Sequence, residues 1–141
     1  MGFWWWVVGI LILMLYAGSA SAWGPYQARY IRNYDGDTVT MIVEPFPNLM
    51  LNETVRLAGV DTPEIRAGCE REKFLALAAK DRVRQLLIGR VVSLTVYAKD
   101  KYGRWLGKIQ ADGESVTDIL IREGLGRAYD GGTRMGWCAG A

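Results

Sequence analysis

Alternating apolar and polar residues mark several short segments of the chain as strands. Val39, Met41 and Val43 alternate with the residues between them, and the same two-residue period returns over residues 92–97. This period is typical of a strand that places one face in a core. Three further segments favour strands, which brings the predicted number to five: residues 27–34, 54–60 and 104–111.

Two Asp-Gly pairs lie where the predicted strands reverse direction. Asp35-Gly36 follows the first predicted strand, and Asp112-Gly113 follows the fifth. Tight hairpin turns need a residue with positive φ, a conformation that glycine adopts without steric cost. We therefore expect positive φ at both pairs.

The hydrophobic period changes to that of a helix between the third and fourth predicted strands. Four apolar residues recur there at spacings of four, four and three on one helical face: Leu75, Ala79, Val83 and Leu86. A second short helix is predicted over residues 115–122, ending at Gly124. Five strands with a helix between the third and fourth describe an OB-fold, a β-barrel with helices of the α+β class.

The N-terminal part of the chain differs in composition from the rest. Residues 3–16 are apolar, too few for a membrane span of about 20 residues, and Ala20-Ser21-Ala22 has the form of a cleavage site. We therefore expect a signal peptide over residues 1–22, an OB-fold domain over residues 23–141, and a secreted or periplasmic protein. Because no Lys or Arg precedes the apolar run, an uncleaved membrane anchor remains the alternative.

Composition narrows the chemistry that this domain can use. The 17 basic and 15 acidic residues leave a net charge of +2, too small for a protein that coats nucleic acid by bulk charge. The chain contains no His, which excludes Ser-His-Asp and Cys-His nucleophiles and most zinc sites. Acid-base or metal chemistry must therefore rest on carboxylates. Cys69 and Cys138 are the only possible cysteine pair, and export favours one disulfide over two free thiols.

Three carboxylates stand at candidate positions for a metal site. Asp37 follows the first Asp-Gly turn, and Asp61 and Glu64 come at the end of the third predicted strand. Each alone is compatible with ordinary turn or helix-capping chemistry. If the strands bring them together, their charges need a cation or a shared proton. Oxygen ligands without His or Cys select a hard ion such as calcium or magnesium.

Two arginines accompany these carboxylates in the sequence. Arg56 lies on the strand that leads to Asp61, and Arg104 follows Gly103 near the start of the fifth predicted strand. A guanidinium can pair with two phosphate oxygens at once, although either arginine alone could be a solvated strand residue. Together with the carboxylates, they suit the transfer of a phosphoryl group.

Four segments of the chain resemble the staphylococcal (micrococcal) nuclease or thermonuclease family. They are Tyr34-Asp35-Gly36-Asp37-Thr38, Val55-Arg56-Leu57-Ala58-Gly59-Val60-Asp61-Thr62-Pro63-Glu64, Asp100-Lys101-Tyr102-Gly103-Arg104 and Leu120-Ile121-Arg122-Glu123-Gly124-Leu125. Their order and spacing cover nearly all of the predicted mature chain. The resemblance implies an OB-fold and a calcium-dependent endonuclease that hydrolyses DNA and RNA and leaves 3′-phosphates.

The resemblance also implies roles for individual residues. Asp37 and Asp61 correspond to the ligands of one calcium ion, with the backbone carbonyl of Thr62 as a further ligand. Glu64 corresponds to the residue that positions or deprotonates the attacking water. The remaining correspondences concern the substrate: Arg56 and Arg104 clamp the phosphate, Lys101 and Tyr102 hold a terminal phosphate, and Tyr129 contacts the nucleotide, although its local spacing is shifted by one residue.

Two departures from the family pattern bear on substrate preference more than on chemistry. The chain ends in a glycine-rich tail from Gly131, where the family's best-known member has a third helix. The segment after Glu64 is shorter than in the family and runs quickly into Cys69. A disulfide from Cys69 to Cys138 could replace the missing helix in bracing the barrel.

Two other functions compete with the secreted nuclease. A catalytically silent binding module usually lacks the carboxylates or the arginines, whereas all five positions are filled here. A membrane-anchored nuclease of a DNA-uptake or DNA-transfer system would differ only in the fate of residues 1–22. The expected partners are DNA and RNA substrates, with a monomeric protein and no obligate protein partner.

Overall fold

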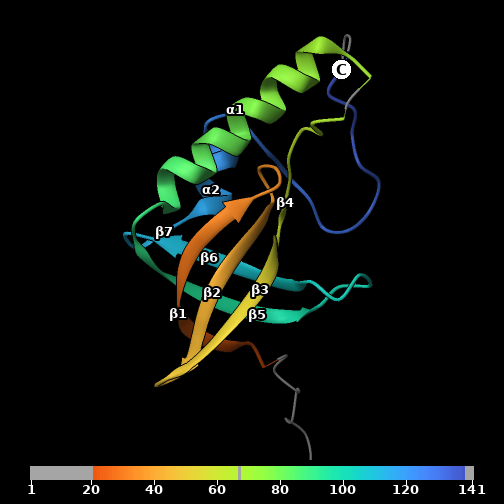
Figure 1. The fold of residues 1–141 in the computed structure, drawn as a ribbon. Helices are drawn as coiled ribbons and strands as arrows, with labels where there is room; N and C mark the ends of the chain where they lie inside the picture. Colours follow the sequence, from red (N-terminus) through yellow and green to blue (C-terminus); the bar gives the residue numbers. More distant parts are fainter. Residues whose placement is uncertain (1–20, 67, 139–141) are drawn as a thin grey trace, which may run out of the picture.

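A closed β-barrel with two helices at one end makes up the computed structural model, which describes residues 21–66 and 68–138 (Figure 1). The strands are β1 (Trp23–Asn33), β2 (Thr38–Phe46), β3 (Leu49–Leu57), β4 (Val60–Asp61), β5 (Val91–Lys99), β6 (Trp105–Ala111), β7 (Glu114–Ser115) and β8 (Arg127–Ala128); the helices are α1 (Glu70–Leu87) and α2 (Val116–Arg122).

The main sheet has the order β3-β2-β1-β5-β6-β7, and a further pairing between β3 and β6 closes it. The neighbours in this order are antiparallel, whereas the closing pair is parallel, with Arg56 opposite Leu106. Five long strands, closed in this way and followed after the third by a helix, form the predicted OB-fold. The fold class is therefore confirmed.

The alternating residues of the strands fill the barrel. Val39, Met41 and Val43 are fully buried, as their two-residue period predicts. Leu94 of β5 and Ile109 of β6 belong to the same buried cluster. This continuous apolar interior fixes the barrel, so that the residues at its rim are held on rigid strands.

The predicted strand over residues 54–60 is too long, because the chain turns within this range. Strand β3 ends at Leu57, Gly59 has a φ of 81°, and Val60 begins the separate strand β4, which pairs with β8. The apolar residues from Leu57 to Val60 give no sign of this turn, because the same residues are compatible with one continuous strand. The turn brings Asp61 to the end of the barrel that carries the candidate site.

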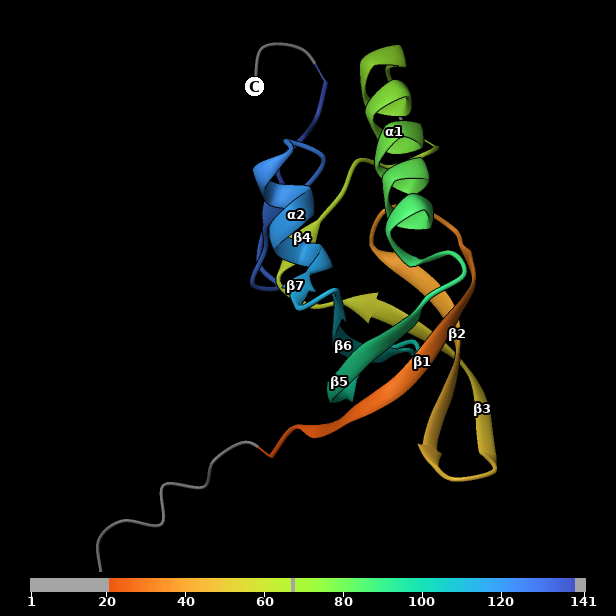
Figure 2. The ribbon, with the colours of Figure 1, turned by 90° about the vertical axis from the view of Figure 1, so that its left-hand side faces the viewer.

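Helix α1 confirms the predicted helix, but its buried face is shifted. The fully buried residues are Ala76, Ala79, Val83 and Leu87, whereas the predicted Leu75 and Leu86 are only partly buried. The small Ala76 and Ala79 allow the helix to approach the barrel closely. Figure 2 shows α1 and α2 side by side at this end of the barrel. The guanidinium of Arg82 joins them by binding the carboxylate of Glu123, with an Nε–Oε2 distance of 2.8 Å.

Positive φ is found at one of the two predicted Asp-Gly turns and not at the other. Asp112 and Gly113 have φ values of 52° and 78°, which confirms a turn with positive φ. Gly36 does not have positive φ, so that prediction is wrong. A Cβ atom at Gly36 would lie 2.8 Å from the Cβ of Ala79 and 2.9 Å from Cγ2 of Thr62. Glycine is required there because α1 packs against the turn, not because of its backbone angles.

The C-terminal residues run back along the molecule to the start of α1 (Figure 1). A disulfide joins Cys138 to Cys69, the residue that caps α1. Trp137 is buried and the guanidinium of Arg127 stacks on its ring at 3.8 Å, while Arg127 Nη1 donates to the carbonyl of Gly136. We call residues 131–138 the C-terminal strap. In the described part of the chain, no helix follows α2, and the strap makes up the last described residues.

Reduction of the disulfide should destabilise the protein by about 4 kcal/mol, because the bond spans a sequence separation of 69 residues and restricts the unfolded chain. Urea unfolding with and without reductant measures this difference. The double variant Cys69→Ser/Cys138→Ser serves as the control, since its stability should not respond to reductant. Equal stability of the oxidised and reduced wild-type proteins would contradict the prediction.

The predicted signal peptide lies mostly outside the described residues, which begin at residue 21. Within the part of the chain that the structure describes, no helix is long and apolar enough to cross a membrane. The described chain is ordered as strand from Trp23 onward, the residue at which we expect the mature protein to begin.

Candidate active site

Two buried aspartates lie on adjoining segments at the helical end of the barrel. Asp37 directly precedes β2, and Asp61 ends β4; their exposed fractions are 5% and 4%. The backbone N–H of Thr62 donates to Oδ2 of Asp37 at 3.2 Å, which ties the two segments together. The structure thus brings the two predicted metal ligands to one place, although they are 24 positions apart in the sequence.

A third buried aspartate, Asp35, supports the turn that carries Asp37. Its Oδ1 accepts a hydrogen bond from the backbone N–H of Asp37 at 3.1 Å, and Asn33 Nδ2 donates to the carbonyls of Asp35 and Lys80 at 2.9 Å. Burial, together with the nearby charge of Asp37, raises the pKa of Asp35 to about 7. The site therefore concentrates acidic groups where little water reaches them.

The donors at this place fit a hard divalent cation. The carboxylates of Asp37 and Asp61 and the oxygens of Thr62 are all oxygen ligands, and the buried Oγ1 of Thr62 has no hydrogen-bond partner in the described structure. Glu64 does not join the two aspartates in a group of three carboxylates within 4.8 Å of one another. A small set of protein ligands suits an ion that keeps water and takes substrate oxygens.

The other close group of potential ligands is not a metal site. Cys69, Glu72 and Cys138 have ligand atoms within 4.8 Å of one another. The two sulfur atoms are bonded to each other, so neither is a thiolate.

Arg56 projects from β3 into the space between the turn and the carboxylates. Its Nη1 donates to the carbonyls of Leu57 and Val60 at 2.8 and 2.9 Å, and its Nη2 lies 3.4 Å from Oδ2 of Asp37. The side chain is 14% exposed. Arg56 therefore holds the turn between β3 and β4 and also keeps part of its guanidinium directed at the site.

Arg104 is held by the loop between β5 and β6. Oδ2 of Asp100 accepts from Nε of Arg104 at 2.6 Å, and Oδ1 of Asp100 accepts from the backbone N–H groups of Tyr102 and Arg104. Burial alone would raise the pKa of Asp100, but these hydrogen bonds lower it. Nη1 of Arg104 reaches Oγ1 of Thr38 at 3.4 Å, so the guanidinium points back toward the residue after Asp37.

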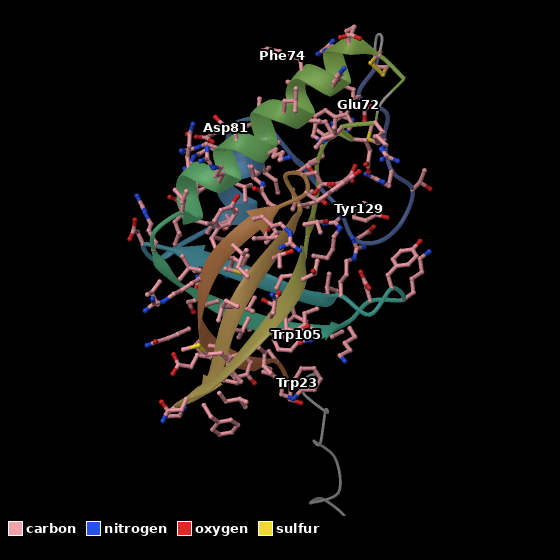
Figure 3. The ribbon with its side chains drawn as sticks, in the orientation of Figure 1. Trp23, Glu72, Phe74, Asp81, Trp105 and Tyr129 are labelled. Carbon is pink, nitrogen blue, oxygen red and sulfur yellow. A yellow bond between two sulfur atoms is a disulfide. The ribbon has the colours of Figure 1, made fainter. Side chains whose placement is uncertain are left out.

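An open cleft of about 760 Å³ gathers the predicted substrate residues beside the carboxylates. This volume is within the range of small-molecule sites. Tyr102 is 72% exposed at the rim, and the ammonium of Lys101 lies 5.1 Å from its ring centre. Figure 3 shows Tyr129 between the C-terminal strap and the barrel. The predicted residues that line the cleft are Arg56, Lys101, Tyr102, Arg104 and Tyr129.

Glu64 follows β4 and Thr62 into the loop before α1. Its backbone N–H donates to Oε1 of Glu72 at 3.1 Å, and its side chain is 44% exposed. A carboxylate with this exposure at the edge of a buried acidic site can meet both water and substrate. The structure therefore places Glu64 where a proton acceptor is useful, beside the aspartates but not among them.

Arg134 in the C-terminal strap joins the site, although it is not among the residues predicted from the sequence. Its Nη2 donates to Oδ1 of Asp61 at 2.5 Å and to Oε1 of Glu64 at 2.6 Å. The hydrogen bond to Asp61 raises the pKa of this guanidinium. Its position in the sequence contained a signal, because Arg134 lies four residues before Cys138, and Glu64 lies five residues before Cys69. A disulfide between these cysteines brings Arg134 and Glu64 into the same region.

Comparison with known proteins assigns this geometry to a family. A family model described as "Staphylococcal nuclease homologue" matches residues 54–135. The chain belongs to the staphylococcal nuclease homologue family. The resemblance inferred from the sequence is thereby confirmed. The matched range begins just before Arg56 and includes Asp61, Glu64, Arg104 and Arg134.

Individual relatives of this staphylococcal nuclease homologue carry nuclease names. The chain is 29% identical to an "Uncharacterized endonuclease" of Escherichia coli O157:H7 over 103 residues, 72% of this chain and 60% of that protein. It is 28% identical to a "Micrococcal nuclease" of Shigella flexneri over 120 residues, 79% of this chain and 63% of that protein. "Endonuclease YncB" of Bacillus subtilis (strain 168) is 33% identical over 99 residues, 68% of this chain and 44% of that protein. The chain thus spans about three fifths or less of the length of these relatives.

Proposed function

We propose that this staphylococcal nuclease homologue is an endonuclease that uses one calcium ion to hydrolyse phosphodiester bonds of DNA and RNA. The observation that carries the proposal is the pair of buried aspartates, Asp37 and Asp61, beside a cleft lined by Arg56 and Arg104. A cation held by acidic ligands and arginines close to it are the groups that a phosphate diester needs together. The names of the relatives support the nuclease activity in this proposal.

The oxygens of Asp37, Asp61 and Thr62 would hold calcium, which when bound supplies positive charge to a phosphate oxygen of the substrate. Glu64 accepts a proton from the water that attacks phosphorus in line. The new bond joins the water oxygen to phosphorus, and the bond from phosphorus to the 5′ oxygen breaks. The 5′ oxygen takes up a proton from solvent and leaves as a hydroxyl. The product strand that keeps the phosphate therefore ends in a 3′-phosphate, and no covalent enzyme intermediate forms.

The arginines stabilise the negative charge that develops on the phosphate oxygens during this attack. Arg104 has its Nε occupied by Asp100 and one donor of Nη1 directed at Thr38, which leaves Nη2 and the second donor of Nη1 for the non-bridging oxygens. Arg56 is anchored by two backbone carbonyls and offers its remaining donors to the phosphate. Lys101, Tyr102 and Tyr129 extend the contact along the strand through the cleft. Donors that are already in place need no reorganisation as charge grows on the phosphate.

We further propose that the enzyme acts outside the cytoplasm, either secreted or periplasmic. The apolar segment over residues 3–16, the small residues that end at Ala22 and the disulfide of the domain support export. A form that keeps residues 1–22 as a membrane anchor would place the same domain at a membrane surface. The substrate would then be nucleic acid that reaches that surface.

The test is hydrolysis of plasmid DNA and of RNA by the purified protein in calcium, in magnesium and in excess chelator. We expect hydrolysis in calcium, loss of hydrolysis in chelator, and 3′-phosphates on the products. Asp37→Ala should lose both calcium binding and turnover while the barrel stays folded, because its side chain is a ligand and not part of the apolar core. Calcium binding is measured by titration calorimetry and folding by circular dichroism.

The matched control is Asp81→Ala, which removes one carboxylate from the exposed side of α1, away from the cleft (Figure 3). This variant should bind calcium and hydrolyse nucleic acid as the wild type does. Full activity in excess chelator would contradict the role of the metal. Binding of nucleic acid without hydrolysis under all three conditions would instead identify the domain as a catalytically silent binding module.

A further inference from the structure

The C-terminal strap places a positive charge on the same carboxylates that would hold the cation. A single nitrogen of Arg134, Nη2, bridges Oδ1 of Asp61 and Oε1 of Glu64 at 2.5 and 2.6 Å. The Arg134 side chain is 45% exposed, whereas that of Asp61 is 5% exposed. The guanidinium therefore contacts the buried carboxylate while part of its side chain stays open to solvent.

A guanidinium and a divalent cation compete for this position. Both are drawn to Oδ1 of Asp61, and both are positively charged, so the presence of one disfavours the other. Arg56 differs from Arg134 in this respect. Its closest approach to a candidate ligand is 3.4 Å to Asp37, and two backbone carbonyls engage its Nη1, so it has little freedom to compete.

The strap is fastened on both sides of Arg134. On one side, the hydroxyl of Tyr129 donates to the carbonyl of Gly132, and the N–H of Gly132 donates to Asp130, both at 2.9 Å. On the other side, Arg127 donates to the carbonyl of Gly136, and Cys138 is joined to Cys69. Because the strap is already ordered, Arg134 reaches the carboxylates with little further loss of conformational entropy.

We propose that the disulfide-fastened strap uses Arg134 as a built-in competitor of the catalytic cation. Arg134 occupies Asp61 and Glu64 when the ion is absent, and ion binding displaces it. This inference rests on the proposed metal site at Asp37 and Asp61. If Arg134 must leave before the ion binds, part of the binding free energy of calcium is used to displace it. The wild-type site therefore binds calcium more weakly than the same site without Arg134.

The experiment is a calorimetric titration of calcium alone into the disulfide-bonded protein, so its readout is affinity and not activity. Arg134→Gln removes the charge but keeps a long polar side chain. We expect this variant to bind calcium at least about 5-fold more tightly than the wild type, the lower end of typical coupling between sites. The control Arg122→Ala removes one charge from the exposed side of α2, where the arginine pairs with Glu114, and should leave the affinity unchanged.

A second variant tests whether the effect of Arg134 on calcium affinity requires the disulfide that holds the strap, or only the presence of the charge. Cys69→Ser/Cys138→Ser keeps Arg134 in the chain but releases the end of the strap. It should also bind calcium more tightly, and adding Arg134→Gln to it should change the affinity much less than in the wild type. If the double-serine variant does not fold, the Arg134→Gln titration in the disulfide-bonded protein decides by itself.

The outcomes distinguish this inference from the proposed function. If the wild type binds calcium through Asp37 and Arg134→Gln has the same affinity, the competition does not exist and the proposed metal site stands. If Arg134→Gln binds more tightly but a folded double-serine variant keeps the wild-type affinity, the fastened strap is not the cause and the inference is wrong. If neither protein binds calcium, the metal site and this inference both fail.

Discussion

Glu64→Gln should lower kcat by about 10²- to 10⁴-fold, the range that general-base catalysis contributes. The amide keeps the size of the side chain and its place at the edge of the acidic site, but it cannot accept a proton from water at pH 7. Glu64 is suited to this role because its side chain is 44% exposed, whereas the neighbouring aspartates are buried. Initial rates on plasmid DNA at saturating calcium give kcat.

Saturating calcium is essential to this measurement. Glu64 is one of the two carboxylates that hold Arg134, so its replacement also weakens that contact and can change the affinity for calcium. The control is Glu70→Gln, which removes an exposed carboxylate from the first turn of α1. Wild-type kcat in Glu64→Gln, with calcium still required, would leave the metal site intact and show that another group activates the water.

Arg104→Lys should lower kcat by about 10²-fold or more, with little change in KM. Lysine keeps the positive charge but loses the planar fork that pairs with two phosphate oxygens, and such pairing strengthens as charge develops in the transition state. The structure makes the substitution informative because Asp100 and Thr38 fix the orientation of the guanidinium. Steady-state kinetics on a short oligonucleotide separate kcat from KM.

The variant Lys101→Ala is compared with Arg104→Lys, because Lys101 is expected to affect substrate binding and not the chemical step. Lys101 is exposed in the same loop, and its ammonium lies near the ring of Tyr102 at the rim of the cleft. A contact made equally with substrate and transition state affects binding alone, so Lys101→Ala should chiefly raise KM. An Arg104→Lys variant that raises KM and keeps kcat would place Arg104 among the binding residues instead.

The sequence by itself determined the elements whose pattern is local. The two-residue period of Val39, Met41 and Val43 and the helical period around Ala79 and Val83 come from one face of one element meeting the core. The family motifs likewise supplied residues that the structure brings to one end of the barrel, including Asp37, Asp61 and Arg104. Such residues are readable because each motif is a short run whose chemistry and spacing do not depend on distant segments.

The tertiary structure alone decided features that depend on contacts between distant segments. The chain turns at Gly59 because β4 pairs with β8, which begins 66 positions after Asp61 and is invisible in the apolar run around it. Gly36 is needed for the close approach of Ala79 on α1, a steric requirement that no turn pattern contains.

Arg134 shows the same limit at the site itself. It is one arginine in a glycine-rich tail, and its only signal in the sequence is that it lies four residues before Cys138. Only the path of the strap to Cys69 brings its guanidinium to Asp61, 73 positions earlier in the chain. The local period of apolar residues shows which face of a segment packs into the core. Ion pairs between distant segments depend instead on which segments the barrel and the disulfide bring together.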